Sequence, residues 1–170
     1  MLAPVILDLD RDGVDLVSRK KSKAKFDMDR NGSRDETGWI GKGDGFLVID
    51  RNGDGLLTGA AELSFLAENN EAGSDLQALG ELDWNGDRKV DSADFRFGEL
   101  RVWVDRDLDG ITDTGELKTL AELGIASINL NARANNVSVR MGQNVLLATS
   151  SYTKTDGSLG AVGDAALAFK

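Results

Sequence analysis

The sequence predicts an α+β fold with a single domain, in which short β-strands flank a helical region that carries aspartate-rich loops. Two observations favour this class. Short runs of β-branched and apolar residues stand near both ends of the chain, whereas apolar residues recur at spacings of three and four from about residue 60. With 170 residues, of which 41% are hydrophobic, the chain can bury one ordinary core, so we expect one domain over residues 1–170.

The N-terminal part is predicted to form three short strands. In the first, PVILDLD, alternation places Val5, Leu7 and Leu9 on one face. The three strands are PVILDLD at 4–10, TGWI at 37–40 and GFLVID at 45–50.

The middle of the chain is predicted to be helical, because its apolar residues follow the helical period. One of these segments begins with a capping residue, Asp91 or Ser92. The expected helices are AAELSFLAEN at 60–69, DLQALGEL at 75–82, SADFRFGEL at 92–100 and GELKTLAELG at 115–124.

Extended structure is expected again at RVWVD, residues 101–105, and throughout the C-terminal part. TDGS at 155–158 is typical of a hairpin turn. The remaining expected strands are SINL at 127–130, VSVRM at 137–141, NVLLATSSYT at 144–153 and AALAF at 165–169.

Five loops repeat one spacing of oxygen-bearing side chains. Asp or Asn stands at relative positions 1, 3 and 5, and glycine follows at position 6 in four of the five. Alternate residues of a tight loop can point oxygen atoms inward while the sixth turns sharply, and such a cage suits Ca²⁺. The residues at these positions are Asp8, Asp10 and Asp12; Asp27, Asp29 and Asn31; Asp50, Asn52 and Asp54; Asp83, Asn85 and Asp87; and Asp105, Asp107 and Asp109.

The fifth loop, residues 105–116, follows the EF-hand ligand pattern throughout. Besides its three aspartates it offers the carbonyl of Ile111, Asp113 at position 9 and Glu116 at position 12.

The fourth loop is the next best match. It offers the carbonyl of Lys89, and Asp94 at position 12 could close the cage. Its sixth residue is Arg88, which must take a positive φ or open the turn.

The first three loops depart further from the pattern. Glu62 falls at position 13 of the third loop, and the first two loops have no acid at position 12. One such loop could be an ordinary Asp- and Gly-rich turn, but five in one chain favour metal binding, with up to about five Ca²⁺ ions. The candidates to replace the missing acids are Asp15, Asp35 and Glu36.

Composition excludes several classes of function. The chain has no cysteine and no histidine, which removes thiolate sites and the usual base of nucleophilic triads. Its 29 acidic and 20 basic residues give a net charge of −9, which disfavours nucleic acid as a partner. No apolar run reaches the roughly 18 residues of a membrane span. We also expect a monomer.

Long motifs in a fixed order resemble the self-processing module of repeats-in-toxin (RTX) proteins of the FrpC type. The resemblance implies a secreted bacterial module that folds on binding Ca²⁺ and then breaks an Asp-Pro bond at its own N-terminal edge. It also implies that the new aspartyl end can be joined to a lysine amine of a neighbouring protein as an isopeptide. The motifs are PVILDLDRDGVDL at 4–16, TGWIGKGDGFLVIDRNGDG at 37–55, LRVWVDRDLDG at 100–110, GELKTLAELGIASINLN at 115–131 and SYTKTDGS at 151–158.

The proline of that bond aligns with Pro4, the only proline in the chain. An aspartate before proline is reactive because its carboxylate can attack its own main-chain carbonyl, closing a five-membered anhydride while the proline nitrogen leaves. Ala3 stands where the family has this aspartate. Ala3 and Pro4 therefore mark the reaction site, and we predict that this copy does not cleave itself. Residue 3 could be a replacement, added sequence or a natural change.

Other functions stay open at this stage. A purely structural calcium module of a toxin or adhesin needs no chemistry. A cohesin-binding dockerin is a second alternative, because DWNGDRKVDSADF at 83–95 is similar to half of such a domain, although no second repeat matches it. Tyr152 and Lys154 are candidate proton donors, but a hairpin tyrosine is more often packed in a core.

Overall fold

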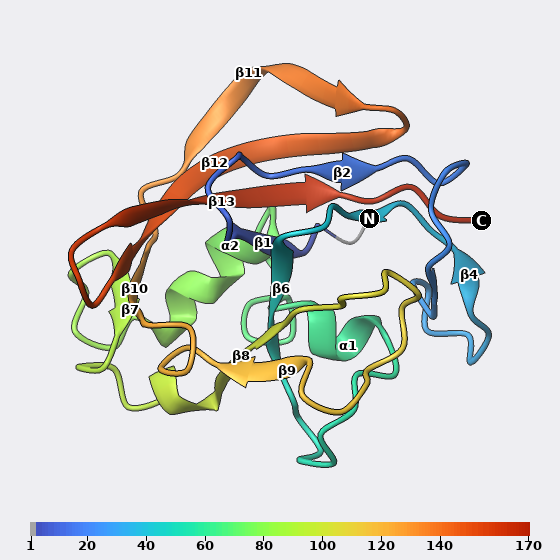
Figure 1. The fold of residues 1–170 in the computed structure, drawn as a ribbon. Coiled ribbons are helices and arrows are strands. Elements are labelled where there is room, and N and C mark those ends of the chain that lie inside the picture. Colours follow the sequence, from blue (N-terminus) through green and yellow to red (C-terminus); the bar gives the residue numbers. More distant parts are fainter. Residues whose placement is uncertain (1–2) are drawn as a thin grey trace.

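The computed structural model describes residues 3–170, and within this range the chain is mostly β-structure (Figure 1). Nine strands form one antiparallel sheet with the order β7-β10-β12-β13-β1-β6-β8-β9, and β11 pairs with β12 beside this path. Two further pairs, β2 with β5 and β3 with β4, stand apart from it. The strands are β1 (Val5–Asp8), β2 (Leu16–Val17), β3 (Lys25–Phe26), β4 (Asp35–Glu36), β5 (Trp39–Ile40), β6 (Asp44–Ile49), β7 (Lys89–Asp91), β8 (Leu100–Trp103), β9 (Leu117–Thr119), β10 (Ile125–Asn129), β11 (Arg133–Met141), β12 (Asn144–Lys154) and β13 (Leu159–Ala166).

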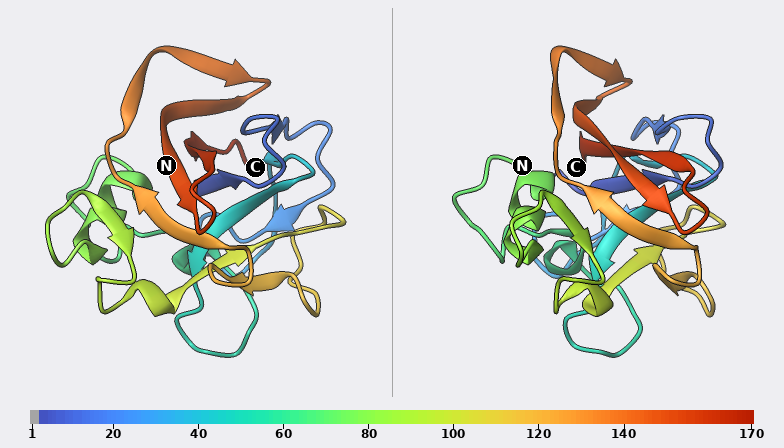
Figure 2. Two further views of the ribbon diagram at one scale, coloured as in Figure 1. Left: turned by 60° about the vertical axis from the view of Figure 1, so that its left-hand side comes forward. Right: turned by 90° about the vertical axis from the view of Figure 1, so that its left-hand side faces the viewer.

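Helical structure is scarce in the described part of the chain. The two α-helices, α1 (Ala60–Leu63) and α2 (Asp75–Ala78), have four residues each. Two short 3₁₀ helices cover Leu79–Leu82 and Phe97–Glu99. Figure 2 shows the large sheet from two further sides, strongly curved, with the β11–β12 hairpin extending beyond the rest of the molecule.

The central strands β1 and β6 are buried on both faces. Ile6 and Phe46 belong to one core cluster together with Leu63 of α1, whereas Val5 belongs to a second cluster together with Leu76 of α2. Figure 1 accordingly shows α1 and α2 on opposite sides of β6. Burial on both faces explains why the sequences of these two strands are continuous apolar runs.

The predicted strands near both ends of the chain are confirmed. The three N-terminal runs form β1, β5 and β6, and Leu9 packs in the same cluster as Val5 and Leu7, as the alternation predicted. In the C-terminal part the runs form β10, β11 and β12, and the TDGS turn joins β12 to β13. The run AALAF is strand only up to Ala166, where β13 ends.

The predicted α+β class is wrong, because the expected helical region is largely absent. Residues 60–69 and 75–82 yield one α-helical turn each, and residues 92–100 yield only a 3₁₀ turn. Segments of about eight to ten residues hold a helix poorly by propensity alone, so their spacing of apolar residues serves packing under the sheet instead. The fold is a curved antiparallel sheet with short helical turns on its faces.

The segment after the fifth loop shows what replaces a helix. The N–H of Val104 donates to the carbonyl of Glu116 at 2.9 Å, which starts a ladder between β8 and β9. Pairing with the sheet edge satisfies the backbone of Leu117–Thr119, so the helix expected over 115–124 does not form. This loop has EF-hand spacing but is flanked by two strands.

Across the described residues, none of the helices has the length and apolar character needed to cross a membrane.

Candidate functional site

All five aspartate-rich loops adopt one tight turn. In each, the carboxylate at position 1 accepts a hydrogen bond from the backbone N–H at position 6, at 2.9–3.0 Å. The shared spacing in the sequence thus has a shared backbone geometry. The pairs, with the acceptor first, are Asp8 and Gly13, Asp27 and Gly32, Asp50 and Gly55, Asp83 and Arg88, and Asp105 and Gly110.

This turn imposes positive φ angles on residues that resist them. Arg88 takes the positive φ that its position at the turn predicted, with a value of 67°. At position 4 of three other loops, Arg11, Arg30 and Leu108 have φ of 71°, 64° and 62°. A left-handed conformation costs about 1–2 kcal/mol at a non-glycine residue. The hydrogen bonds to the position-1 carboxylate offset that strain.

The fifth loop brings three of its predicted ligands together. Carboxylate oxygens of Asp105, Asp107 and Glu116 lie within 4.8 Å of one another, so this group could hold a metal ion. Asp105 and Glu116 are each 2% exposed, and Nε1 of Trp39 donates to Asp105 at 2.7 Å. Burial raises the pKa of Asp105 to about 6, so the protein alone compensates its ionised form incompletely.

The other predicted members of the fifth loop lie outside this acidic group. Asp109 accepts a hydrogen bond from the N–H of Ile111 at 2.7 Å, and the N–H of Asp113 donates to Glu116 at 3.0 Å. The side chains of Ile111 and Asp113 are exposed. They shape the loop around the three converging carboxylates.

The first loop recruits an acid from another strand. Asp8 and Asp10 form a second group with Asp44, the first residue of β6, and the ligand atoms again lie within 4.8 Å. The β1–β6 register places Asp8 directly opposite Asp44. Asp44 is 2% exposed, its Oδ1 has no hydrogen-bond partner among the described residues, and burial raises its pKa to about 7. A cation between these carboxylates would remove that penalty.

The other acids of the first loop have different surroundings. The N–H of Asp15, an expected substitute ligand, donates to Asp44 at 2.8 Å, so Asp15 positions the ligand group through its backbone. Asp12 is exposed, and a hydrogen bond with Asp10 raises its pKa.

The second loop forms a third group, from Asp27, Asp29 and Asp35. Asp35 thereby takes the place of the missing position-12 acid, which is one of the substitutions that the sequence suggested. The side chain of Asn31 donates to Asp29 at 2.9 Å, next to the group. Glu36 lies outside the group, with an exposed side chain.

The third and fourth loops keep the turn without converging acids. In the described structure no three acidic side chains meet there, because the middle position is an amide, Asn52 or Asn85. The residues at positions 1, 3 and 5 are half-buried or exposed; they are Asp50, Asn52 and Asp54, and Asp83, Asn85 and Asp87. Lys89, two residues after Asp87, donates its backbone N–H to that carboxylate at 3.0 Å.

The fourth and fifth loops nevertheless end in the same way. Asp94 accepts from the N–H groups of positions 2 and 9, Trp84 and Asp91, at 2.7 and 2.9 Å. Glu116 accepts from the equivalent positions of its loop at 2.8 and 3.0 Å. In the third loop Glu62 accepts only from position 9, Thr58, at 3.0 Å. The acid at position 12 thus closes the last two loops through hydrogen bonds from two backbone N–H groups.

Ala3 and Pro4 lie buried at the start of β1. Ala3 is 5% exposed, and its backbone N–H faces the carboxylate of Asp75. The carbonyl of Pro4 accepts the N–H of Ala165 in β13 at 3.2 Å. The bond between residues 3 and 4 is therefore enclosed by the fold and held from both sides.

The family model described as the SPM domain matches residues 5–168 of the chain. The chain belongs to the SPM domain family. This SPM domain is similar to the iron-regulated protein FrpA of Neisseria meningitidis serogroup C, with 44% identity over 170 residues that cover 97% of the chain. It spans only 15% of the length of that relative. Both matches agree with the family resemblance that the motifs predicted.

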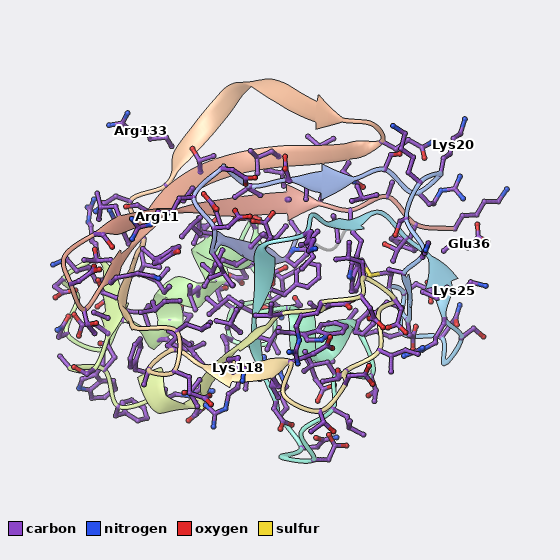
Figure 3. All side chains as sticks on the ribbon, viewed as in Figure 1. Arg11, Lys20, Lys25, Glu36, Lys118 and Arg133 are labelled. Carbon is purple, nitrogen blue, oxygen red and sulfur yellow. The ribbon has the colours of Figure 1, made fainter. Side chains whose placement is uncertain are left out.

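Tyr152 is a packing residue in this SPM domain. Its side chain is fully buried, its hydroxyl donates to the carbonyl of Asp8 at 2.6 Å, and its ring packs against Gly160. Tyr152 thus holds the end of β1 and the beginning of the first loop. Arg11 of that loop reaches the β12–β13 turn, where it donates to the hydroxyl of Ser158 (Figure 3).

Sequence reasoning missed Asp44 as a member of an acidic group of the SPM domain. A signal was present, because Asp44 opens the apolar run that forms β6. Antiparallel pairing of that run with the first strand would bring Asp8 and Asp44 to one end of the sheet.

Proposed function

We propose that this SPM domain is a calcium-dependent self-processing module whose reaction site is the bond between residues 3 and 4, and that Ala3 makes this copy unable to cleave. One observation carries the proposal: Pro4 is buried at the start of a central strand of an SPM domain, four residues before an acidic group that could hold a metal ion. An exposed N-terminal tail would offer no means of controlling such a bond.

Calcium fits the acidic groups by their chemistry. Every ligand offered is a hard oxygen, and the buried Asp44 oxygen without a partner calls for a positive charge. Bound Ca²⁺ would neutralise carboxylates that otherwise repel one another in a chain of net charge −9. The residues proposed to hold it are Asp8, Asp10 and Asp44; Asp27, Asp29 and Asp35; and Asp105, Asp107 and Glu116.

The protein's contribution to the reaction is geometric. β1 pairs with β13 on one side and with β6 on the other, so the backbone after Pro4 has little freedom. With an aspartate at residue 3, the carboxylate would be held beside its own carbonyl, which raises the effective concentration of the attacking group. A cation at Asp8, Asp10 and Asp44 would order this strand but lie away from the bond, because residues 4 and 8 are about 13 Å apart along a strand.

The proposed partner in ligation is a lysine amine of a neighbouring protein, which would open the anhydride in place of water. The proposed setting is outside a bacterial cell, where calcium is abundant. Lysines of this chain such as the exposed Lys20 and Lys25 lie at the outside of the molecule in Figure 3, so other copies could also offer amines.

A purely structural calcium module is the second candidate, and Ala3 favours it for this copy. A methyl group cannot attack a carbonyl, so the chain as written would only bind calcium and fold.

The deciding experiment restores the aspartate. The full chain carrying a small reporter protein at its N-terminus, with Ala3→Asp, should release the reporter on addition of millimolar CaCl₂ by cleavage between residues 3 and 4. Ala3→Asn is the matched control and should be much slower, because an amide is a poor nucleophile. Mass spectrometry should find the reporter ending in aspartate or bonded through it to a lysine. A folded, calcium-loaded Ala3→Asp protein that stays uncut over days would leave the structural module as the function.

A further inference from the structure

Two buried acids outside all five loops lie near the start of β1. Asp75, the first residue of α2, and Asp164 of β13 are both 0% exposed. Neither oxygen of Asp164 and only one oxygen of Asp75 has a hydrogen bond of normal geometry within the part of the chain that the structure describes. Buried carboxylates are costly without partners, so these two need an explanation beyond stability.

The strand register places Asp164 on the same face as the side chain of Val5. Val5 and Asp164 are opposite each other, and the N–H of Ala165 bonds to the carbonyl of Pro4. Val5 and Asp164 are therefore a non-hydrogen-bonded pair, in which the side chains lie close together on one face. The hydrogen bond between Ala165 and Pro4 continues the pairing one residue before β1, so from the alternation of side chains along a strand we infer that residue 3 lies on that face as well.

The helix α2 covers this face. Val5 packs in one cluster with Leu76, and the Ser74 hydroxyl and the Leu76 N–H face Asp164, although without normal hydrogen-bond geometry. The titratable group that faces Asp164 is Asp75, from α2. The neighbouring strands β1 and β12 present the uncharged Val5 and Ala148 in register with it.

Asp75 is anchored at one oxygen and open at the other. Its Oδ1 accepts hydrogen bonds from the Ser64 hydroxyl and from the N–H groups of Phe65 and Leu66, at 2.7, 2.5 and 3.1 Å. Its carboxylate also faces the N–H of Ala3. Asp75 thus contacts the amide on the upstream side of the reaction site.

We propose that Asp164 is the proton donor to the nitrogen of Pro4, and that Asp75 is a positioning residue that holds the amide of residue 3. This assignment rests on the proposed self-processing function. It concerns the form of the module that carries an aspartate at residue 3.

Burial supports a protonated Asp164. It raises the pKa of Asp164 to about 6, with a further increase from the charge of Asp75, whose own pKa is also raised by burial. A third carboxyl group at residue 3 would disfavour ionisation of its neighbours further. With a pKa of about 6, a fraction of Asp164 keeps its proton near neutral pH, where the tertiary nitrogen of Pro4 needs one in order to leave.

The steps balance in atoms and charge. The carboxylate of the introduced aspartate forms a bond to its own carbonyl carbon, the bond from that carbon to the Pro4 nitrogen breaks, and the proton of Asp164 moves to that nitrogen. The products are a cyclic anhydride on the upstream fragment, a free N-terminal proline amine and an ionised Asp164. Water or a lysine amine then opens the anhydride, and Asp164 accepts the proton released by the attacking group.

The test uses the Ala3→Asp reporter fusion of the full chain at saturating calcium, with folding followed by circular dichroism. Asp164→Asn should lower the cleavage rate by about 10²–10⁴, the range typical of general acid catalysis. The exposed Asp156→Asn, in the β12–β13 turn, is the matched control and should leave the rate unchanged. In the parent, the rate should fall as the pH rises above the pKa of Asp164, and Asp164→Asn should abolish this dependence.

Asp75 is tested by rescue. Asp75→Asn keeps an acceptor oxygen and should retain most of the rate with an unchanged pH profile, whereas Asp75→Ala should lose about tenfold or more. If the Asp164 variant fails to fold, the pH profile of the Ala3→Asp fusion decides the question. A cleavage rate of that fusion that does not decline from pH 6 to 8 overturns the proposal.

The outcomes separate the two proposals. If Ala3→Asp does not cleave, the self-processing function fails. If it cleaves, and folded Asp164→Asn cleaves equally fast with the same pH profile, self-processing stands and the assignment of Asp164 is wrong.

Discussion

The third loop, residues 50–62, and the fifth loop, residues 105–116, have the same turn but different surroundings. Asp50 and Asp105 both accept hydrogen bonds from positions 4 and 6 of their loops. Asp105 is 2% exposed and bonded to the core residue Trp39, whereas the third loop protrudes from the end of β6 into solvent (Figure 1).

The spacing of Asp and Asn thus determines the shape of the turn, whereas burial determines whether its carboxylates need a cation. Water screens the carboxylates of the third loop, so backbone N–H groups suffice to hold it. In the fifth loop Asp105 and Glu116 face each other inside the protein, where only a cation can fully compensate them. The fifth loop should therefore couple calcium to folding, and the third should not.

Metal removal should give the largest effect. If three groups bind calcium at about ten times the dissociation constant, each adds about 1.4 kcal/mol, or roughly 4 kcal/mol in all. This is a large share of a typical domain stability of about 5–15 kcal/mol. Circular dichroism should show a largely disordered chain in EDTA and restored structure in millimolar CaCl₂, with MgCl₂ much less effective. Equal thermal midpoints in EDTA and calcium would contradict the coupling.

Matched glycine substitutions should separate the two loops next. Gly110 and Gly55 have similar φ values of 78° and 75°, but a Cβ on Gly110 would lie 2.6 Å from the carbonyl oxygen of Lys25, while Gly55 has open space. We expect Gly110→Ala to cost about 3 kcal/mol, from strain plus overpacking, and Gly55→Ala about 1 kcal/mol. Urea denaturation in calcium measures both, and equal losses would show that the two loops have equivalent surroundings.

The closing acids provide a third test. Glu116→Gln should raise the calcium concentration needed for folding about tenfold, because it removes a charge from the buried group. Glu62→Gln, which alters an acid outside the three groups, should leave most of the calcium dependence. The quantity to compare is the difference in thermal midpoint between calcium and EDTA for each variant. A larger reduction in Glu62→Gln would reverse our ranking of the loops.

The smallest effect concerns the ion pairs beside the third loop. Hydrogen bonds from Arg96 and then Arg51 hold the pKa of Glu68 below its ordinary value of 4.5. The stability that ionised Glu68 adds through these hydrogen bonds is therefore present above pH 4.5. It is lost as the pH falls through the lower pKa of the folded state. Because the group is partly screened, Glu68→Gln should cost less than about 1 kcal/mol at pH 6, and the difference from the wild type should shrink by pH 3. Thermal midpoints at both pH values test this expectation.

The parts of the fold that could be predicted from the sequence are those that depend on neighbours in the chain. β1 and β6 are continuous apolar runs because both faces are buried, and the five turns follow from the spacing of Asp, Asn and Gly. The helices were wrong because a spacing of three and four fits any surface that packs under a sheet. Whether residues 117–119 extend a helix or join a strand depends on the edge of β8, a distant partner.

The acidic residues of the site divide in the same way, into those set by neighbours in the chain and those set by distant partners. The spacing predicted which acids of one loop lie close together, as with Asp105, Asp107 and Glu116, but Asp44 joins Asp8 only through the β1–β6 register. Asp75 and Asp164 carry no local signal, since each stands alone in its segment of the sequence. Only the pairing of β1 with β13 and the position of α2 bring both acids to residue 3.

The placement of β1 between β6 and β13 also sets an order of events in time. Within this domain Pro4 is synthesised well before Ala165, the residue whose N–H bonds to its carbonyl. A chain in which β13 has not yet been made lacks one of the two strands that flank β1. Chemistry that needs the bond between residues 3 and 4 to be enclosed would therefore wait until β13 has been made and has paired with β1.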